Sequence, residues 1–177
     1  MSTYDVVLLV EEPFSSEDAA NVTQLHEGVE DAVRYHVLLP VEDASAYVES
    51  AVGSLGGDSL GAPVAGVDAE EVSQVNQELM TACQEGVAAT VASINAAGGD
   101  ASGTPVATDP INALAAKVEE LGAAEVIIMT RPHVVAQLFH VDWTSRARRK
   151  LGVPVLHLLE HESFDEQAGD GEGISGF

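Results

Sequence analysis

The sequence predicts an α/β fold: a doubly wound, Rossmann-like parallel sheet of five strands with helices on both faces. Short aliphatic runs rich in β-branched residues alternate along the chain with segments of helical periodicity, which is the pattern of β-α-β units. Aromatic residues make up only 5% of the 177 residues, so aliphatic side chains must form the core. This length fits one domain, over residues 1–160. We expect residues 161–177, which are acidic and lack Lys and Arg, to be a disordered tail.

The first strand is expected at Val6–Val10, because an unbroken apolar run is typical of a parallel strand that is buried on both faces. A helix then begins at Ser15-Ser16, where either hydroxyl can act as the N-cap. Tyr35–Leu39 is the second strand. Residues 41–67 are interrupted by glycines and a proline, so we expect a loop or flap there.

A long helix is expected over residues 68–98, where apolar side chains recur at helical spacing. Gly86 lies inside this helix and could weaken or kink it. The next strand is expected at Thr104–Ala107. It should lie near an edge of the sheet, because Pro105 has no N–H to donate to a neighbouring strand.

The last third of the domain has clear start and stop signals. Asp109-Pro110 predicts a helix start, with an N-cap side chain followed by proline in the first turn, and Gly122 predicts its end. Glu125–Met129 and Val153–Leu159 are expected to be buried strands. The intervening residues 132–151 have the pattern of two helical segments.

Composition argues against several classes of partner. The formal net charge is −22 and the isoelectric point is near 4.2, so nucleic acids and anionic membrane surfaces would be repelled. No apolar run is long enough to span a membrane, and the N-terminus lacks the pattern of a signal peptide. A single cysteine excludes an internal disulfide. We therefore expect a cytoplasmic protein.

The basic residues are strongly clustered. Five of the seven Lys and Arg residues lie between Arg131 and Lys150, a window with only one acid, Asp142. A cationic cluster in an anionic protein indicates a site for a small anion, above all a phosphate. The alternative is that Arg146–Lys150 form the solvated face of a short helix.

The predicted topology gives this anion site a location. Ligands of doubly wound sheets bind beyond the carboxyl ends of the strands, where the winding reverses. We expect the reversal between the strands at Val6–Val10 and Glu125–Met129. Glu11-Glu12-Pro13 and Thr130-Arg131-Pro132-His133 would then border one crevice, where the basic window begins.

Three segments together resemble the universal stress protein family: Asp109-Pro110-Ile111, Val126–Arg131 and Ser145–Leu156. The resemblance implies a five-stranded fold of the adenine nucleotide alpha hydrolase type and ATP in the crevice, held by a glycine-rich loop after the fourth strand. It also implies a homodimer formed through the last strand, with interface residues Val153, Val155, His157 and Leu159.

The chain departs from the family's glycine pattern. Met129, Pro132 and about Val141 stand where the glycines would be, and Asp142 replaces the expected Ser or Thr. The acid that meets the adenosine end would be Glu11. Hydroxyl groups and cations near the crevice could take over from the missing backbone donors; they belong to Thr144, Ser145, Arg131, Arg146 and Arg149.

We therefore expect a non-enzymatic binder of an adenine nucleotide or another small phosphate, with Arg131 as the chief phosphate contact. The alternatives are a dimeric interaction module whose pocket is closed by Met129 and Pro132, and a weak nucleotide hydrolase. No catalytic motif stands out in the sequence. His133 and His140 lack a third metal ligand at fixed spacing, so we expect no metal site.

Overall fold

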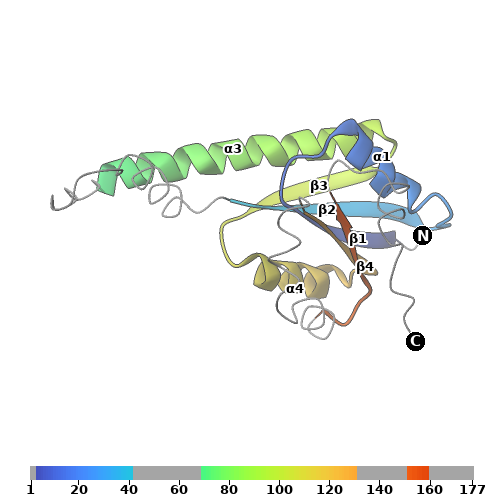
Figure 1. Ribbon diagram of the computed structural model, residues 1–177. Helices are drawn as coiled ribbons and strands as arrows, with labels where there is room; N and C mark the ends of the chain where they lie inside the picture. Colours follow the sequence, from blue (N-terminus) through green and yellow to red (C-terminus); the bar gives the residue numbers. More distant parts are fainter. Residues whose placement is uncertain (1–2, 42–68, 131–150, 160–177) are drawn as a thin grey trace, which may run out of the picture.

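The computed structural model describes residues 3–41, 69–130 and 151–159 (Figure 1). Five parallel strands form one sheet in the order β3-β2-β1-β4-β5. This confirms the predicted fold class. In chain order the elements are β1 (Thr3–Val10), α1 (Ser16–Gln24), β2 (Ala32–Pro40), α3 (Ala69–Ala96), β3 (Asp100–Val106), α4 (Pro110–Leu121), β4 (Glu125–Thr130) and β5 (Val155–Leu159).

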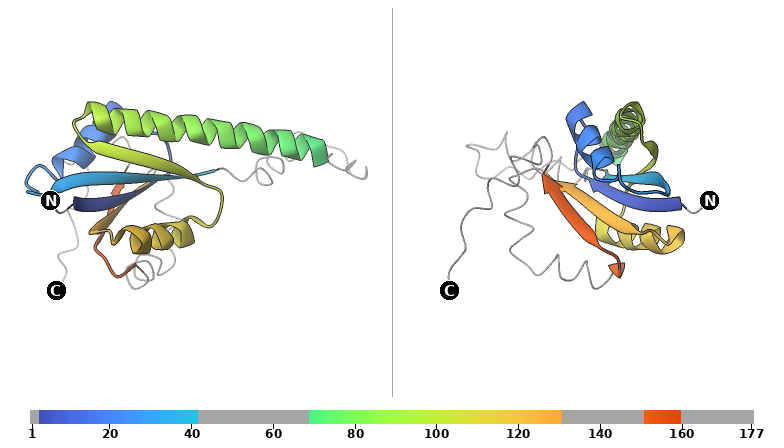
Figure 2. Two further views of the ribbon diagram at one scale, coloured as in Figure 1. Left: turned by 180° about the vertical axis from the view of Figure 1, so that it is seen from behind. Right: turned by 90° about the vertical axis from the view of Figure 1, so that its right-hand side faces the viewer.

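The sheet is covered on both faces: α1 and α3 pack on one side and α4 on the other (Figure 2). Side chains of β1 alternate between the two resulting cores. Val6, Leu8 and Val10 belong to the core under α1 and α3, whereas Val7 and Leu9 belong to the core under α4. Because both faces are buried, an uninterrupted apolar run suits this central strand.

Several boundaries differ from the sequence expectation. Both β2 and β3 begin earlier than predicted, because their polar first halves still find a neighbouring strand: Ala32 pairs with Thr3 of β1, and Asp100 pairs with Arg34 of β2. The last strand begins at Val155 and not at Val153. The pairing of β4 with β5 starts only there, opposite Val126.

The expected edge position of β3 is confirmed within the described sheet. The Ala101 N–H points away from β2 and is accepted by Asn95 Oδ1 at 3.0 Å. Backbone N–H groups alternate in direction along a strand, so Pro105, four residues further, occupies a position that also faces away from β2. Its missing N–H therefore costs no hydrogen bond to β2.

The helix caps follow the predicted signals. Ser15 is the N-cap of α1 and forms a reciprocal capping box with Asp18. The Asp109 side chain accepts the Asn112 N–H at 2.8 Å at the start of α4. Gly122 ends that helix with a φ of 60°, a left-handed conformation that glycine adopts without strain.

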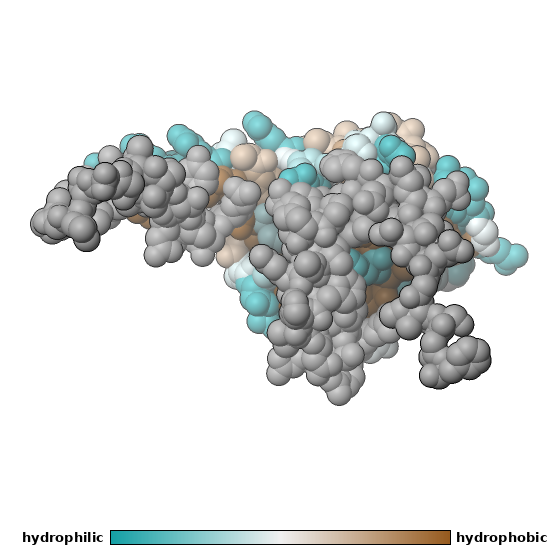
Figure 3. All heavy atoms as spheres, viewed as in Figure 1, coloured by the Kyte–Doolittle hydropathy of each residue, from teal (hydrophilic) through white to brown (hydrophobic). Residues whose placement is uncertain are grey.

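The 28-residue helix α3 runs unbroken through Gly86 and extends well past the end of the sheet (Figure 1). Gly86 therefore does not interrupt the helix. Glycine at this position instead allows a close approach: a Cβ there would lie 2.9 Å from Leu39 Cδ2 and 3.0 Å from Pro13 Cγ. Gly103 does the same on β3, where a Cβ would lie 2.4 Å from Val87 Cγ1. Hydrophilic side chains project from the outer side of α3 (Figure 3).

Cys83 of α3 is buried, and its Sγ donates to the Leu39 carbonyl at 3.3 Å. Burial raises the pKa of this thiol, so it stays protonated and packs as a small apolar side chain. None of the described helices combines the length and apolar character that a membrane span requires.

A buried polar cluster ties four elements together near the amino ends of the strands. His26 Nε2 lies 2.7 Å from Glu125 Oε1, and His26 Nδ1 lies 3.0 Å from both the Val22 carbonyl and the Tyr35 hydroxyl. The Tyr4 hydroxyl donates to Glu125 Oε2 at 3.2 Å. Each imidazole nitrogen thus faces an acceptor, which favours the doubly protonated ring.

The pKa values of this pair follow from these contacts. Burial lowers the pKa of His26, but the hydrogen bond to Glu125, the Val22 carbonyl and the Glu125 charge outweigh it, so the net pKa is raised. The hydrogen bond from His26 lowers the pKa of Glu125 against the opposing effect of burial. Burial, with the Glu125 charge, raises the pKa of Tyr35 to about 12, so this phenol stays protonated.

The pair predicts a pH window of stability. A raised His26 pKa stabilises the fold below the reference value of 6.5 and loses that effect as pH rises through the folded pKa. A lowered Glu125 pKa stabilises above 4.5 and loses its effect as pH falls. Glu125→Gln should therefore lower the free energy of unfolding most between these two values, by about 1.5–3 kcal/mol. Urea unfolding from pH 4 to 9 measures this, and a pH-independent loss would contradict it.

Candidate functional site

The winding of the sheet reverses between β1 and β4, which is where the sequence predicts the crevice. From β1 the chain adds β2 and β3 on one side, then crosses back to place β4 and β5 on the other. Val10 pairs with Met129 at the carboxyl end, and the Glu11 N–H donates to the Met129 carbonyl at 3.2 Å. Glu11 and Thr130 therefore leave the sheet as neighbours, as the sequence predicted.

The loop from β1 to α1 is held in place by α3. The Phe14 N–H donates to Thr90 Oγ1 at 3.1 Å, and Ser93 Oγ donates to the Phe14 carbonyl at 3.4 Å. Phe14 and Thr90 are both buried. Pro13 remains exposed beside Gly86 of α3. These contacts give the loop at one wall of the crevice a fixed backbone.

The other wall contains a buried hydroxyl and an imidazole. Thr130 Oγ1, at the end of β4, lies 2.8 Å from His157 Nε2 on β5. Only 6% of Thr130 is exposed. Burial lowers the pKa of His157, so the ring is neutral at neutral pH. A neutral imidazole and a hydroxyl can each donate or accept, which leaves this wall able to orient a polar ligand.

The described part of the crevice is acidic. Glu11 and Glu12 follow β1, and both are partly exposed. Among the described residues the basic side chains, Arg34 and Lys117, belong to the amino half of β2 and to α4. The other five Lys and Arg residues of the sequence lie between 131 and 150, outside the described residues.

Some of the predicted site residues lie within the described ranges and others lie outside them. The structure brings Glu11, Pro13 and Thr130 to the carboxyl ends of β1 and β4. The Met129 side chain is buried in the core under α1 and α3. The other predicted ligand-binding residues lie outside the described residues: Arg131, His133, Thr144, Ser145, Arg146 and Arg149.

The proposed interface strand is also only partly described. Val155 is 8% exposed and packs in the core under α4, and Val153 is partly buried against the same core. The His157 ring turns toward Thr130. The backbone of Leu159 closes β5. Among the described side chains of β5, that of Leu156 is exposed, at 39%.

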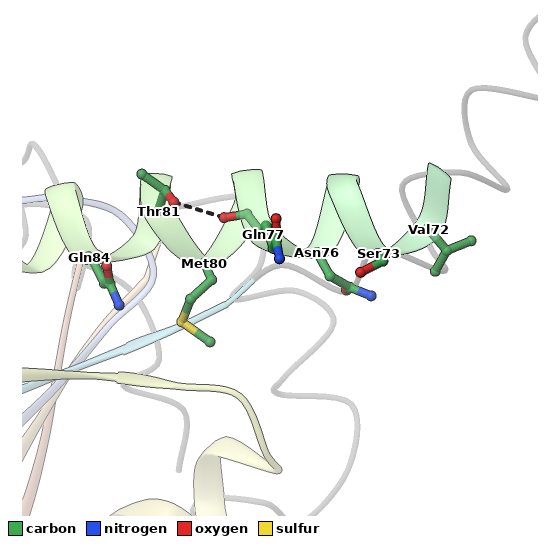
Figure 4. A pocket seen from close by; sticks show the side chains of 7 residues that line it. All are labelled: Val72, Ser73, Asn76, Gln77, Met80, Thr81 and Gln84. Carbon is green, nitrogen blue, oxygen red and sulfur yellow. Dashed lines mark hydrogen bonds between the residues drawn. The ribbon is translucent and has the colours of Figure 1, made fainter. Parts of the chain in front are cut away.

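A separate surface depression of about 590 Å³ lies along α3 (Figure 4). All of its lining residues come from this one helix, and none is charged: Val72, Ser73, Asn76, Gln77, Met80, Thr81 and Gln84. Ligand sites usually combine walls from several elements with convergent polar groups. The depression lacks both features, and we do not assign a ligand to it.

No group of three or more His, Cys, Asp or Glu side chains in the described ranges is arranged to hold a metal ion. His133, His140 and Asp142 lie outside those ranges.

Sequence reasoning missed Thr90 and Ser93 as supports of the crevice. Their spacing of three places both on one face of α3, but so does the spacing of many helix residues. Only the crossing of α3 over the β1–α1 loop shows that they bind the backbone of Phe14.

Comparison with known proteins identifies the fold. No protein-family model matches the chain, and no curated protein matches it in sequence. Among solved structures, hypothetical protein MJ0577 has a TM-score of 0.59 at 13% identity, covering 90% of this chain and 97% of that one. A universal stress protein family protein from Arabidopsis thaliana, with AMP bound, has a TM-score of 0.51 at 11% identity, covering 92% and 94%. The chain has the universal stress protein fold.

The support that α3 gives the crevice is testable. Thr90→Val keeps the shape of the side chain but removes the acceptor of the buried Phe14 N–H, so we expect a loss of about 1–3 kcal/mol in the free energy of unfolding. Thr81→Val is the matched control, because the hydroxyl of the exposed Thr81 donates to the Gln77 carbonyl within α3 and not to another element. Urea unfolding compares the two variants. Equal losses would show that the contact with Phe14 is not stabilising.

Proposed function

We propose that this protein is a cytoplasmic, non-enzymatic binder of an adenine nucleotide, or of another small phosphate-bearing anion, in the crevice between β1 and β4. The observation that carries the proposal is the reversal of strand order at this point, with Glu11 and Thr130 at the carboxyl ends of the two strands. Parallel sheets bind ligands at such reversals. The AMP bound to the Arabidopsis protein of the same fold supports the choice of ligand.

The residues of the crevice suit the two ends of a nucleotide. A Glu11 carboxylate accepts hydrogen bonds from ribose hydroxyls or an adenine amino group, and Pro13 offers an exposed apolar surface beside it. Thr130 and His133 would orient the ligand near β4. Arg131 would be the chief phosphate contact, with Thr144, Ser145 and Arg146 as further donors.

The second candidate is a dimeric interaction module that binds no nucleotide. Pro132 and Asp142 favour it, because one has no N–H to donate to a phosphate and the other repels it. For either candidate we propose a homodimer that forms through β5, the strand at one edge of the described sheet, with Val153, Val155, His157 and Leu159 as its interface residues.

Calorimetric titration of the full chain with AMP, ADP, ATP, cyclic AMP and inorganic phosphate tests the ligand. We expect saturable binding of at least one adenine nucleotide, and a 10–100-fold loss in Arg131→Ala, the equivalent of about 1.5–3 kcal/mol for one charged hydrogen bond. Lys117→Ala is the charge-matched control, since Lys117 pairs with Glu120 on α4, and it should bind as the parent does.

Absence of saturable binding at about 1 mM of every nucleotide, an affinity worth only about 4 kcal/mol, would reject the first candidate and leave the interaction module. Equal affinity for phosphate and AMP would assign a simple anion site. Equal losses in Arg131→Ala and Lys117→Ala would show that net charge, and not a local contact, controls binding.

The dimer has its own test. Leu156 on β5 and Leu25 at the end of α1 are equally exposed, at 39% each. Leu156→Asp should convert a dimer into a monomer in sedimentation velocity, because it places a charge in the apolar interface, while Leu25→Asp should remain dimeric. A monomeric parent protein, or identical behaviour of the two variants, would contradict the interface through β5.

A further inference from the structure

Three side chains with catalytic chemistry lie side by side on the sheet, away from the crevice. Asp5 belongs to the amino half of β1, His36 to β2 and Ser102 to β3. In the strand pairing, His36 is opposite Val7 of β1 and Ser102 of β3, which puts these residues on the face that packs on α4. Three strands thus assemble a cluster that no local sequence motif could show.

Hydrogen bonds join the three residues in a chain. His36 Nε2 lies 2.8 Å from Asp5 Oδ1, and His36 Nδ1 lies 3.3 Å from Ser102 Oγ. Thr3 Oγ1 donates to the other Asp5 oxygen at 2.9 Å. An ionised carboxylate only accepts hydrogen bonds, so a neutral His36 carries its proton on Nε2. Its Nδ1 lone pair then faces the Ser102 hydroxyl, the arrangement of a nucleophile with its general base.

The electrostatics of the cluster support this polarity. The hydrogen bond from His36 lowers the pKa of Asp5 against the opposing effect of burial, with help from the Thr3 hydroxyl and the Arg34 charge. Asp5 therefore remains an anion at neutral pH and holds the ring in one tautomer. The side chains of His36 and Asp5 are 17% and 15% exposed, which is sheltered enough to limit competition from water.

The cluster is also accessible and has a cation beside it. Ser102 is exposed on the edge strand β3. Arg34, two residues before His36 on the same face of β2, has a side chain that is 53% exposed. Its guanidinium lies a loose 3.9 Å from Asp100, so it can turn toward negative charge that develops near Ser102.

We propose that Ser102, His36 and Asp5 form an acyl-transfer site that accepts the acyl group of small, neutral, activated esters. Ser102 Oγ attacks the ester carbonyl carbon while His36 Nδ1 takes the hydroxyl proton. The carbon–oxygen bond to the alcohol breaks, and His36 returns the proton to the leaving oxygen. Water then attacks acyl-Ser102 with His36 as base, releasing the carboxylic acid and restoring the serine.

The shape and charge of the protein set the substrate class. An exposed serine on an edge strand offers contacts to a short acyl group only, and the leaving group must be good because little binding energy is available. The formal charge of −22 repels anionic donors such as acyl phosphates. This site is independent of the nucleotide crevice, which lies at the opposite end of β1.

The test uses the full chain with p-nitrophenyl acetate, followed by mass spectrometry and peptide mapping. We expect acetylation at Ser102, lost in Ser102→Ala and unchanged in Ser73→Ala, which removes an exposed serine of α3. His36→Gln should slow acetylation of Ser102 by 100-fold or more, in the range that general-base catalysis supplies, ~10²–10⁴. Mapping separates this reaction from acetylation of other nucleophiles.

Asp5 is a positioning residue and needs a different readout. An Asp5→Asn side chain can donate to Nε2, which moves the ring proton to Nδ1 and removes the base, so the rate should fall at least 10-fold while Asp5→Glu recovers most of it. Thermal unfolding checks that each variant is folded. Acetylation of Ser102 no faster than that of Ser73, or an unchanged rate in folded His36→Gln, would overturn the proposal.

Discussion

The structure depends on the parallel pairing of β1 with strands on both sides. A central strand of a dry sheet must place all its backbone N–H and C=O groups in hydrogen bonds, because an unpaired group costs about 1–3 kcal/mol. β1 meets this requirement through β2 and β4 together. Its side chains from Val6 to Val10 are nearly all inaccessible to solvent. The position of a residue along β1 therefore determines whether its side chain is buried in the core or partly exposed at an end of the sheet.

Along β1 and β4, polar side chains are excluded from the middle of the strand and lie at its two ends. At the amino end, Glu125 pairs with His26 on one face and Asp5 with His36 on the other. At the carboxyl end, Glu11 and Thr130 leave the last paired residues. Each of these two partly buried carboxylates has a histidine nitrogen within 3 Å, because a charge in that environment requires a hydrogen-bond donor.

The close fit of α3 connects the core to the crevice. Gly86 and Gly103 let this helix approach the sheet where a side chain would collide, and the approach brings Thr90 and Ser93 to the backbone of Phe14. A loop fixed in this way keeps its polar groups oriented without a ligand, which would reduce the ordering cost of the binding proposed above. The close packing of α3 on the sheet thus has a direct consequence for the geometry of the β1–α1 loop.

The sequence by itself determined the fold class, the order of elements, the caps at Asp109 and Gly122, and the reversal of strand order between β1 and β4, because these follow from local periodicity and from chain topology. Tertiary structure alone decided the start of β5 at Val155 and the straight path of α3 through Gly86. It also decided the contacts of Phe14 with Thr90 and of Asp5 with His36 and Ser102. Such contacts join residues far apart in sequence, and only the register of the strands and the crossing of the helix bring their atoms within hydrogen-bonding distance.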